Sequence, residues 1–277
     1  MAGGLARTIE RARRIGAETV QVFPSNPRQW RRRAYGREEL ARWGEELRRA
    51  GLPLFVHTIY LINLASPDRT LRTRSAAALA DALSFGALAA SQAVVTHIGS
   101  HRGAGFDSGL RCVVESVAEA LSLFHSVSGV AAAPPPLLLE VSAGAENSLG
   151  ATPTEVGRIL AALPDEAGVC LDTAHLFAAG FPVHTAEGFE DFLAEMDRRV
   201  GLRRIGLVHL NDSMSALGSR ADRHENLGEG KIGRDGLALW VRARSLQRVC
   251  FVIETPGFGD EGPDRRNLLR AKRLRAR

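Results

Sequence analysis

Gly168-Val-Cys-Leu-Asp172 is a continuous apolar run that ends in a carboxylate. A short run of this kind is typical of a parallel strand that is buried on both faces. Six similar runs recur along the chain, at 19–23 (TVQVF), 52–57 (LPLFVH), 93–97 (AVVTH), 136–140 (PLLLE), 205–210 (IGLVHL) and 249–254 (VCFVIE). The sequence therefore predicts seven short strands.

Helical patterns separate these runs. Leu110, Val113, Val117 and Leu121 recur at helical spacing and give one apolar helix face. Further helices are predicted at 5–15, 185–196 and 263–275. Strict alternation of strand and helix favours a parallel α/β fold, and at this length a TIM (β/α)8-type barrel that forms a single domain over residues 1–277. The count is one strand short of eight, so we expect the first barrel strand to be lacking.

The composition is that of a soluble globular protein, with 24% charged and 45% hydrophobic residues. No apolar run reaches the roughly 18 residues of a membrane helix, and no signal-peptide core precedes the first helix. We therefore expect a cytoplasmic protein without a membrane partner. Three widely spaced cysteines exclude a disulfide scaffold and a cysteine zinc ribbon. The net charge of +5 is compatible with an anionic partner, although a solvated basic surface explains it as well.

Six of the seven runs end in a histidine or a carboxylate, or carry one near the end. These residues are His57, His97, Glu140, Asp172, His209 and Glu254. Because the carboxyl ends of parallel barrel strands point to one face, we expect the six side chains to converge there. Nitrogen and oxygen donors without a thiolate favour Zn, Mn or Fe over a structural cysteine site. A single histidine at a strand end is ordinary, but six such strand ends predict a functional site.

Three further donors lie in loops after the strands: His175, close behind Asp172, and the pair Asp222 and His224. Nine donors exceed the needs of one metal ion and suit a centre of two or three ions. Two ions about 4 Å apart can supply hydroxide at neutral pH and stabilise both the attacking and the leaving oxygen of a phosphoryl displacement. The donor set thus indicates metal-assisted hydrolysis.

The order and spacing of the motifs closely resemble those of the endonuclease IV family of apurinic/apyrimidinic endonucleases, almost from end to end. The matching stretches are 26–30 (NPRQW), 60–64 (YLINL), 97–101 (HIGSH), 170–180 (CLDTAHLFAAG), 209–212 (HLND), 218–224 (GSRADRH), 227–230 (LGEG) and 253–257 (IETPG). The resemblance implies a TIM barrel with three Zn²⁺ ions, with Mn²⁺ as an alternative at one position. The implied ligands are His57, His97 and Glu140 for the first ion, Glu140, Asp172, His209 and Glu254 for the second, and His175, Asp222 and His224 for the third.

The resemblance also implies the reaction and the partner. The expected activity is hydrolysis of the phosphodiester 5′ to an abasic site in double-stranded DNA, as a step of base-excision repair. It leaves a 3′-hydroxyl and a 5′-deoxyribose phosphate. Glu140 would orient the attacking hydroxide, and the expected DNA contacts are Arg28, Gln29, Tyr60 and Arg223. Extrusion of an abasic nucleotide is cheap because it lacks pairing and most stacking. We expect a monomer that acts at the nucleoid.

The chain departs from the family pattern at several positions. Val141 follows the bridging glutamate where the family has asparagine, Met214 replaces an expected lysine, and Ile98 stands where proline is usual. Glu146 adds negative charge near the expected DNA. These changes are expected to weaken DNA affinity without removing metal ligands.

Two other functions fit parts of the sequence. A sugar isomerase or epimerase of the same barrel superfamily would need only Glu140, Asp172, His209 and Glu254. The extra donors argue against it. A truncated, catalytically impaired DNA-binding relative is the second alternative, given the lacking first strand.

Overall fold

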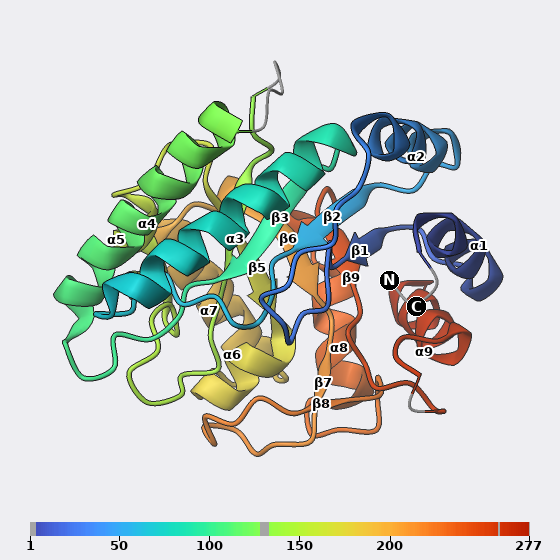
Figure 1. The fold of residues 1–277 in the computed structure, drawn as a ribbon. Coiled ribbons are helices and arrows are strands. Elements are labelled where there is room, and N and C mark those ends of the chain that lie inside the picture. Colours follow the sequence, from blue (N-terminus) through green and yellow to red (C-terminus); the bar gives the residue numbers. More distant parts are fainter. Residues whose placement is uncertain (1–3, 128–132, 260, 277) are drawn as a thin grey trace. The chain divides into compact units, whose positions relative to one another are not determined.

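The structure is a computed structural model that describes residues 4–127, 133–259 and 261–276 (Figure 1). The chain divides into two compact units. The first comprises Met1–Leu139 and Ala161–Gly168, and the second comprises Glu140–Leu160 and Val169–Arg277. Residues 1–3, at the expected start of the chain, and part of the stretch that connects α4 to β4 lie outside the described residues. The expectation of a single domain over residues 1–277 stays a prediction.

The first unit alternates helices and strands in chain order. Its elements are α1 (Leu5–Ile15), β1 (Val20–Val22), α2 (Arg37–Arg49), β2 (Leu54–His57), α3 (Arg69–Leu88), β3 (Ala93–His97), α4 (Phe106–Val127) and most of β4 (Leu137–Glu140). Strands β1, β2 and β3 pair in parallel, with Val22 opposite Val56 and His57 opposite Val95. Helices α3 and α4 pack along each other (Figure 1).

Local sequence explains where the elements of the first unit begin and end. The Asp68 side chain caps α3 by accepting hydrogen bonds from the backbone N–H groups of Thr70 and Leu71. Helix α1 ends at Gly16, whose φ of 79° is the left-handed conformation that glycine adopts without strain. All four residues of β2 are buried, as expected for a strand covered on both faces.

The second unit continues the alternation and adds a hairpin. Its elements are α5 (Pro153–Leu160), β5 (Gly168–Asp172), α6 (Thr173–Ala179), α7 (Ala186–Arg199), β6 (Ile205–His209), β7 (Asp212–Ser213), β8 (His224–Glu225), α8 (Gly233–Arg242), β9 (Cys250–Val252) and α9 (Arg265–Ala276), with short 3-10 helices at Leu202–Arg204 and Arg244–Leu246. Strands β5, β6 and β9 pair in parallel, and β7 pairs with β8 in antiparallel fashion. The hairpin was not expected, because the sequence suggested a loop there.

The register of the second unit places functional residues side by side. Asp172 is directly opposite His209 at the ends of β5 and β6. The core beneath is aromatic: the fully buried Trp240 packs against Phe189 at a centroid distance of 5.0 Å. All seven predicted strands are present, and their bounds differ from the expected ones by a few residues. In the described ranges, no helix is both long and apolar enough to span a bilayer.

Candidate metal centre

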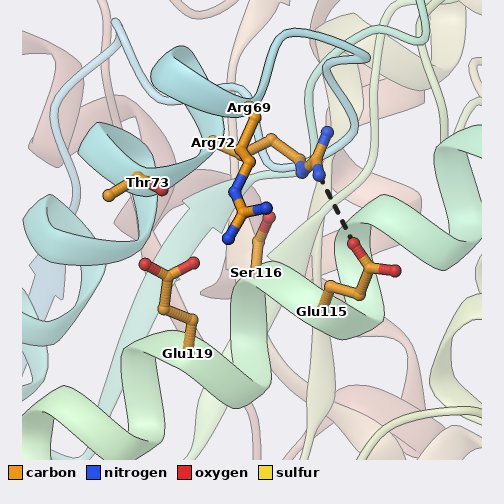
Figure 2. A pocket seen from close by; sticks show the side chains of 6 residues that line it. All are labelled: Arg69, Arg72, Thr73, Glu115, Ser116 and Glu119. Atoms are coloured by element: carbon orange, nitrogen blue, oxygen red, sulfur yellow. Dashed lines mark hydrogen bonds and ion pairs between the residues drawn. The ribbon is translucent and has the colours of Figure 1, made fainter.

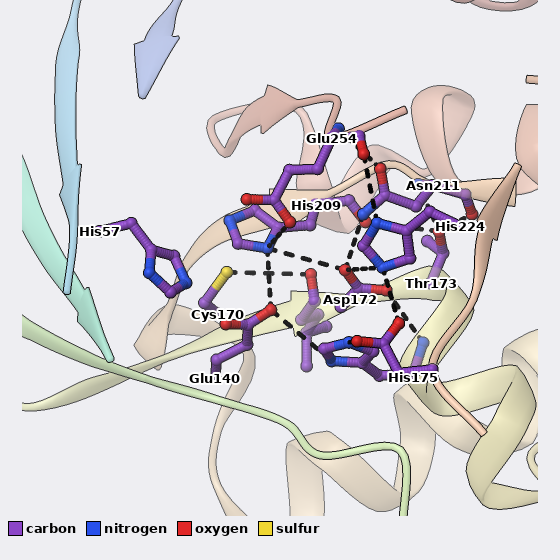
Figure 3. Close-up of polar contacts among 12 residues, drawn as sticks. His57, Glu140, Cys170, Asp172, Thr173, His175, His209, Asn211, His224 and Glu254 are labelled. Carbon is purple, nitrogen blue, oxygen red and sulfur yellow. Dashed lines mark hydrogen bonds and ion pairs between the residues drawn. The ribbon is translucent and has the colours of Figure 1, made fainter. Parts of the chain in front are cut away.

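His209 lies among three carboxylates in the second unit. Its Nδ1 is 3.0 Å from Oε1 of Glu140, 3.2 Å from Oε2 of Glu254 and 3.7 Å from Oδ2 of Asp172. Figure 3 shows the three acidic side chains pointing toward this imidazole. Their donor atoms all lie within 4.8 Å of one another, and only Glu254 is partly exposed. The structure thus brings together four of the predicted ligands.

A second group of donors shares Asp172 with the first. Asp172, His175 and His224 place ligand atoms within 4.8 Å of one another. The Asp222 carboxylate contacts both imidazoles, at 3.2 Å from Nε2 of His175 and 3.1 Å from Nε2 of His224. Asp172 also caps α6, because its side chain accepts a hydrogen bond from the backbone N–H of His175 at 2.9 Å. One carboxylate therefore fixes the start of a helix and joins the two donor groups.

The imidazoles of this centre hold protons because of their acidic neighbours. Burial lowers the pKa of His224, but Asp172 and Asp222 outweigh burial and raise the pKa to about 9. Burial likewise opposes protonation of His175 and His209, yet nearby acidic groups raise the pKa of both well above the usual range. Burial raises the pKa of Asp222, but His175 and His224 lower it more strongly, far below its ordinary value. The acidic neighbours therefore favour the protonated form of all three imidazoles in the metal-free chain.

Three of the predicted histidine ligands have a ring nitrogen next to a backbone carbonyl. The acceptors of Nδ1 are the carbonyl oxygens of Thr58 for His57 at 2.7 Å, of Val141 for His175 at 2.9 Å and of Glu254 for His224 at 3.3 Å. A carbonyl oxygen only accepts, so Nδ1 must carry the hydrogen. In the neutral ring the lone pair then lies on Nε2, which is the arrangement that metal ligation by histidine requires.

The first unit carries two further predicted ligands, His57 and His97. Their rings lie edge to face at a centroid distance of 5.3 Å. Tyr60 stacks on His97, with the ring planes 19° apart and the centroids 5.7 Å apart, and Phe23 packs edge-on against Tyr60. Tyr60 is nevertheless 46% exposed. A large aromatic ring is therefore held at the surface beside two predicted ligands.

The other expected DNA contacts lie on exposed loops. Arg28 and Gln29 follow β1, and the backbone N–H of Tyr60 donates a hydrogen bond to the Pro27 carbonyl at 2.9 Å. The loop with Arg28 and Gln29 is thus joined to the turn with Tyr60. Arg223 lies in the second unit between the ligands Asp222 and His224. The roles of Arg28, Gln29, Tyr60 and Arg223 as DNA contacts stay predictions.

Sequence reasoning missed Asn211, which bridges two predicted ligands. Its Nδ2 donates a hydrogen bond to Oδ2 of Asp172 at 2.7 Å, and its Oδ1 accepts one from the backbone N–H of Glu254 at 2.8 Å. Its own backbone N–H donates to the Thr173 hydroxyl at 2.8 Å. The amide is fully buried and fixed in one orientation (Figure 3). The only sequence signal was the polar pair Asn211 and Asp212, which follows the predicted ligand His209 after one leucine in the motif at 209–212.

The chemistry of the donors fits divalent metal ions. Three carboxylates around one imidazole, mostly buried, concentrate negative charge that costs several kcal/mol per ion in a low-dielectric setting unless a cation balances it. Mixed imidazole and carboxylate donors suit Zn²⁺ and Mn²⁺. Cys170 is a neighbour of His209, and burial raises the pKa of its thiol to about 12, although His209 acts in the opposite direction. Burial thus favours the protonated thiol in the metal-free chain, and the predicted ligand set consists of nitrogen and oxygen donors.

One cavity is lined by residues of the first unit alone, none of them a predicted ligand. It measures about 260 Å³ and lies between α3 and α4 of the first unit (Figure 2). Arg72 spans it, donating to the backbone carbonyl of Ser66 at 2.9 Å and approaching Glu115 at 3.4 Å. This ion pair ties the two helices together, which accounts for the charged lining without a ligand.

Comparison with known proteins identifies the fold. The sequence model of a family described as a xylose isomerase-like TIM barrel matches residues 9–275. The crystal structure of endonuclease IV from Thermus thermophilus superposes with a TM-score of 0.82 at 36% identity, covering 99% of this chain and 93% of that one. A D-tagatose 3-epimerase-like protein superposes with a TM-score of 0.67 at 17% identity, covering 94% and 88%, and so shares the fold alone. The predicted TIM-barrel class is confirmed.

Sequence identity relates the chain to one family within this fold. A probable endonuclease 4 from Chloroflexus aggregans is 37% identical over 277 residues, covering 99% of this chain and 95% of the relative. Full-length similarity at this level, the matching motifs and the clustered donors all agree with the resemblance noted in the sequence. The chain belongs to the endonuclease IV family, a family of hydrolytic DNA-repair nucleases with the TIM-barrel fold.

Proposed function

We propose that this chain is a zinc-dependent endonuclease that cleaves double-stranded DNA on the 5′ side of abasic sites. Water attacks the phosphorus, the bond from phosphorus to the 3′-oxygen breaks, and the 3′-oxygen takes up a proton. The products are a 3′-hydroxyl and a 5′-deoxyribose phosphate. The observation that supports the proposal most is the pair of donor groups joined at Asp172, because two ions in such groups suit phosphoryl displacement.

The proposed ligands are those implied by the family. His57, His97 and Glu140 would hold one ion, and Glu140 with Asp172, His209 and Glu254 a second. His175, Asp222 and His224 would hold the third, in keeping with the contacts of Asp222 to both imidazoles. Bound divalent ions supply Lewis-acid stabilisation of phosphate charge and a nucleophile at neutral pH.

The chain's own residues would position the reactants. Glu140 is buried, its side chain contacts His209, and it is proposed to orient the attacking oxygen by accepting its hydrogen. The exposed Tyr60 ring would stack where a base is missing, and Arg28 and Gln29 would reach the same gap from the adjoining loop. Arg223 would contact a phosphate beside the centre.

The epimerase alternative accounts for less of the structure. It would use His209 and the three carboxylates around it, and it would give no role to His175, Asp222 and His224. The nuclease proposal, in contrast, gives a role to the Asp222 carboxylate, which contacts both imidazoles. The likeness to an epimerase-like protein is one of fold only.

A duplex with one tetrahydrofuran abasic analogue tests the function. We expect a single incision 5′ to the analogue in the presence of Zn²⁺, and no incision of the intact duplex. Binding to the abasic duplex without incision would support the impaired relative instead. Absence of both binding and incision, combined with turnover of a ketohexose, would contradict the nuclease and favour the epimerase.

Metal binding is expected to release protons. At neutral pH the raised pKa values leave His224, His175 and His209 protonated in the metal-free chain. Ligation needs the ring lone pair, so a protonated histidine must lose its proton when it binds Zn²⁺, and we expect release of about one proton or more per chain. For the same reason, zinc affinity should decrease as the pH is lowered below the His224 pKa of about 9. Calorimetric zinc titrations in buffers of different ionisation enthalpy measure the release. A heat that is independent of the buffer would contradict it.

A further inference from the structure

Asp212 is a fully buried carboxylate to which the proposed reaction gives no role. Its two oxygens accept five backbone hydrogen bonds, at 2.8 to 3.2 Å, from Ser213, Gly228, Gly230, Ile232 and Gly233. A buried carboxylate is strongly disfavoured unless its oxygens accept hydrogen bonds. Main-chain donors meet this need here, so the side chain is bound to backbone on both of its oxygens.

The glycines around Asp212 make this arrangement sterically feasible. A Cβ on Gly230 would lie 2.5 Å from Oδ1 of Asp212 and 2.6 Å from the Ser213 carbonyl oxygen. Gly228 and Gly233 have φ values of 79° and 71°, which other residues adopt only with strain. A concave run of N–H groups of this kind is an anion-binding nest. The anion in this nest is a side chain of the chain itself, so the glycine-rich segment 228–233 is not a vacant phosphate loop.

Asp212 also lies at the base of the hairpin that carries two predicted ligands. It pairs with Glu225, and Ser213 pairs with His224. The backbone N–H of Met214 donates to the Arg223 carbonyl at 2.9 Å, which extends the pairing to Arg223, the residue next to Asp222. The nest therefore joins the first strand of the hairpin to the segment that follows its second strand.

We propose that Asp212 is a positioning residue that holds this hairpin where Asp222 and His224 contact His175. It would thereby set the affinity of one metal ion of the proposed centre, the ion bound by those three residues. Glu140 and His209 end the strands β4 and β6, and Asp172 ends β5, so their donor group depends on the main strands instead. The inference rests on the proposed function only in that this ion is assumed to bind.

The variant Asp212→Asn tests the proposal. An amide offers one acceptor oxygen and places an NH₂ group against N–H donors, so at least two of the five hydrogen bonds are lost in either orientation. We expect about 10- to 100-fold weaker binding of one Zn²⁺ ion per chain, the usual effect of losing an outer-shell partner, with the other ions unchanged. Zinc titration of the metal-free protein against a chromophoric chelator measures this directly.

Two further variants complete the experiment. Asp68→Asn alters a carboxylate that also accepts two backbone hydrogen bonds but caps α3 in the first unit, and it should leave every zinc affinity unchanged. Gly230→Ala keeps Asp212 but pushes a Cβ against its oxygen, and it should reproduce the selective loss. Three results would overturn the proposal. They are an equal loss of affinity for every Zn²⁺ ion, unchanged zinc affinities in both Asp212→Asn and Gly230→Ala, and failure of both variants to fold with zinc present.

The zinc titration separates this inference from the proposed function. An unaltered chain that binds zinc but does not incise the abasic duplex contradicts the nuclease alone. A chain that incises, but whose Asp212→Asn variant binds every ion normally, contradicts the positioning role alone.

Discussion

Replacement of Glu140 by glutamine is expected to lower kcat for incision of the abasic duplex by about a thousandfold. Lewis-acid and nucleophile effects of a metal pair contribute several kcal/mol, and loss of about 4 kcal/mol corresponds to this factor. Glutamine keeps the size of the side chain but removes the charge that the proposal uses to bridge two ions. Because Oε1 of Glu140 is 3.0 Å from Nδ1 of His209, the substitution also disturbs that imidazole.

The control for this variant is Glu155→Gln. The Glu155 carboxylate accepts hydrogen bonds from the backbone N–H groups of Gly150 and Ala151 in the same unit, and glutamine keeps an acceptor there. It should incise at the rate of the unaltered chain. Single-turnover rates on the tetrahydrofuran duplex measure both variants. If the Glu140→Gln protein incises within about tenfold of the rate of the unaltered chain, the proposed catalytic role of Glu140 is wrong.

Removal of the metal is expected to abolish incision and to lower the thermal midpoint by roughly 10 °C. Ligands present at about a thousand times their Kd stabilise a fold by about 4 kcal/mol, and each kcal/mol moves the midpoint of a chain this long by about 2–4 °C. The physical reason is the group of carboxylates around His209, whose negative charge bound divalent ions would balance.

The measurement is a thermal scan and an incision assay after chelation and gel filtration, with the residual metal counted. Addition of Zn²⁺ should restore both properties. Mg²⁺ should not, because it demands six oxygen-type ligands and this centre is rich in imidazole. A chain that incises at full rate after all bound metal is removed would refute metal dependence.

The strand ends of the fold could be predicted because periodicity and chemistry coincide there. Asp172 and His209 close apolar runs, and parallel pairing sets them opposite each other in the structure. The predicted run to Glu254 was too long, since β9 ends at Val252. Beyond that point the backbone N–H of Glu254 donates to the side chain of Asn211 instead of to a neighbouring strand. A side chain that replaces a strand partner leaves no periodic signal.

The hairpin of β7 and β8 could not be predicted for a related reason. Each strand has two residues, which is too short for any alternation to appear. Its position depends on Asp212, whose partners are backbone N–H groups as far along the chain as Gly233. Backbone N–H groups give no sequence signal, apart from the glycines that supply some of them. Asp222 and His224 were singled out as donors from the sequence, and the resemblance assigned them to one ion, whereas their contacts with His175 required the structure.

The hydrogen bonds from ring nitrogens to main-chain carbonyls have a consequence for mutational drift. The acceptors for His57, His175 and His224 belong to the peptide backbone, which every amino acid supplies equally. Val141 illustrates this, because its carbonyl orients His175 whatever its side chain is, and the resemblance places another residue type there. Substitutions around the imidazoles can therefore accumulate without turning the rings. The orientation of these imidazole rings thus depends on the path of the backbone and not on the side chains of the neighbouring residues.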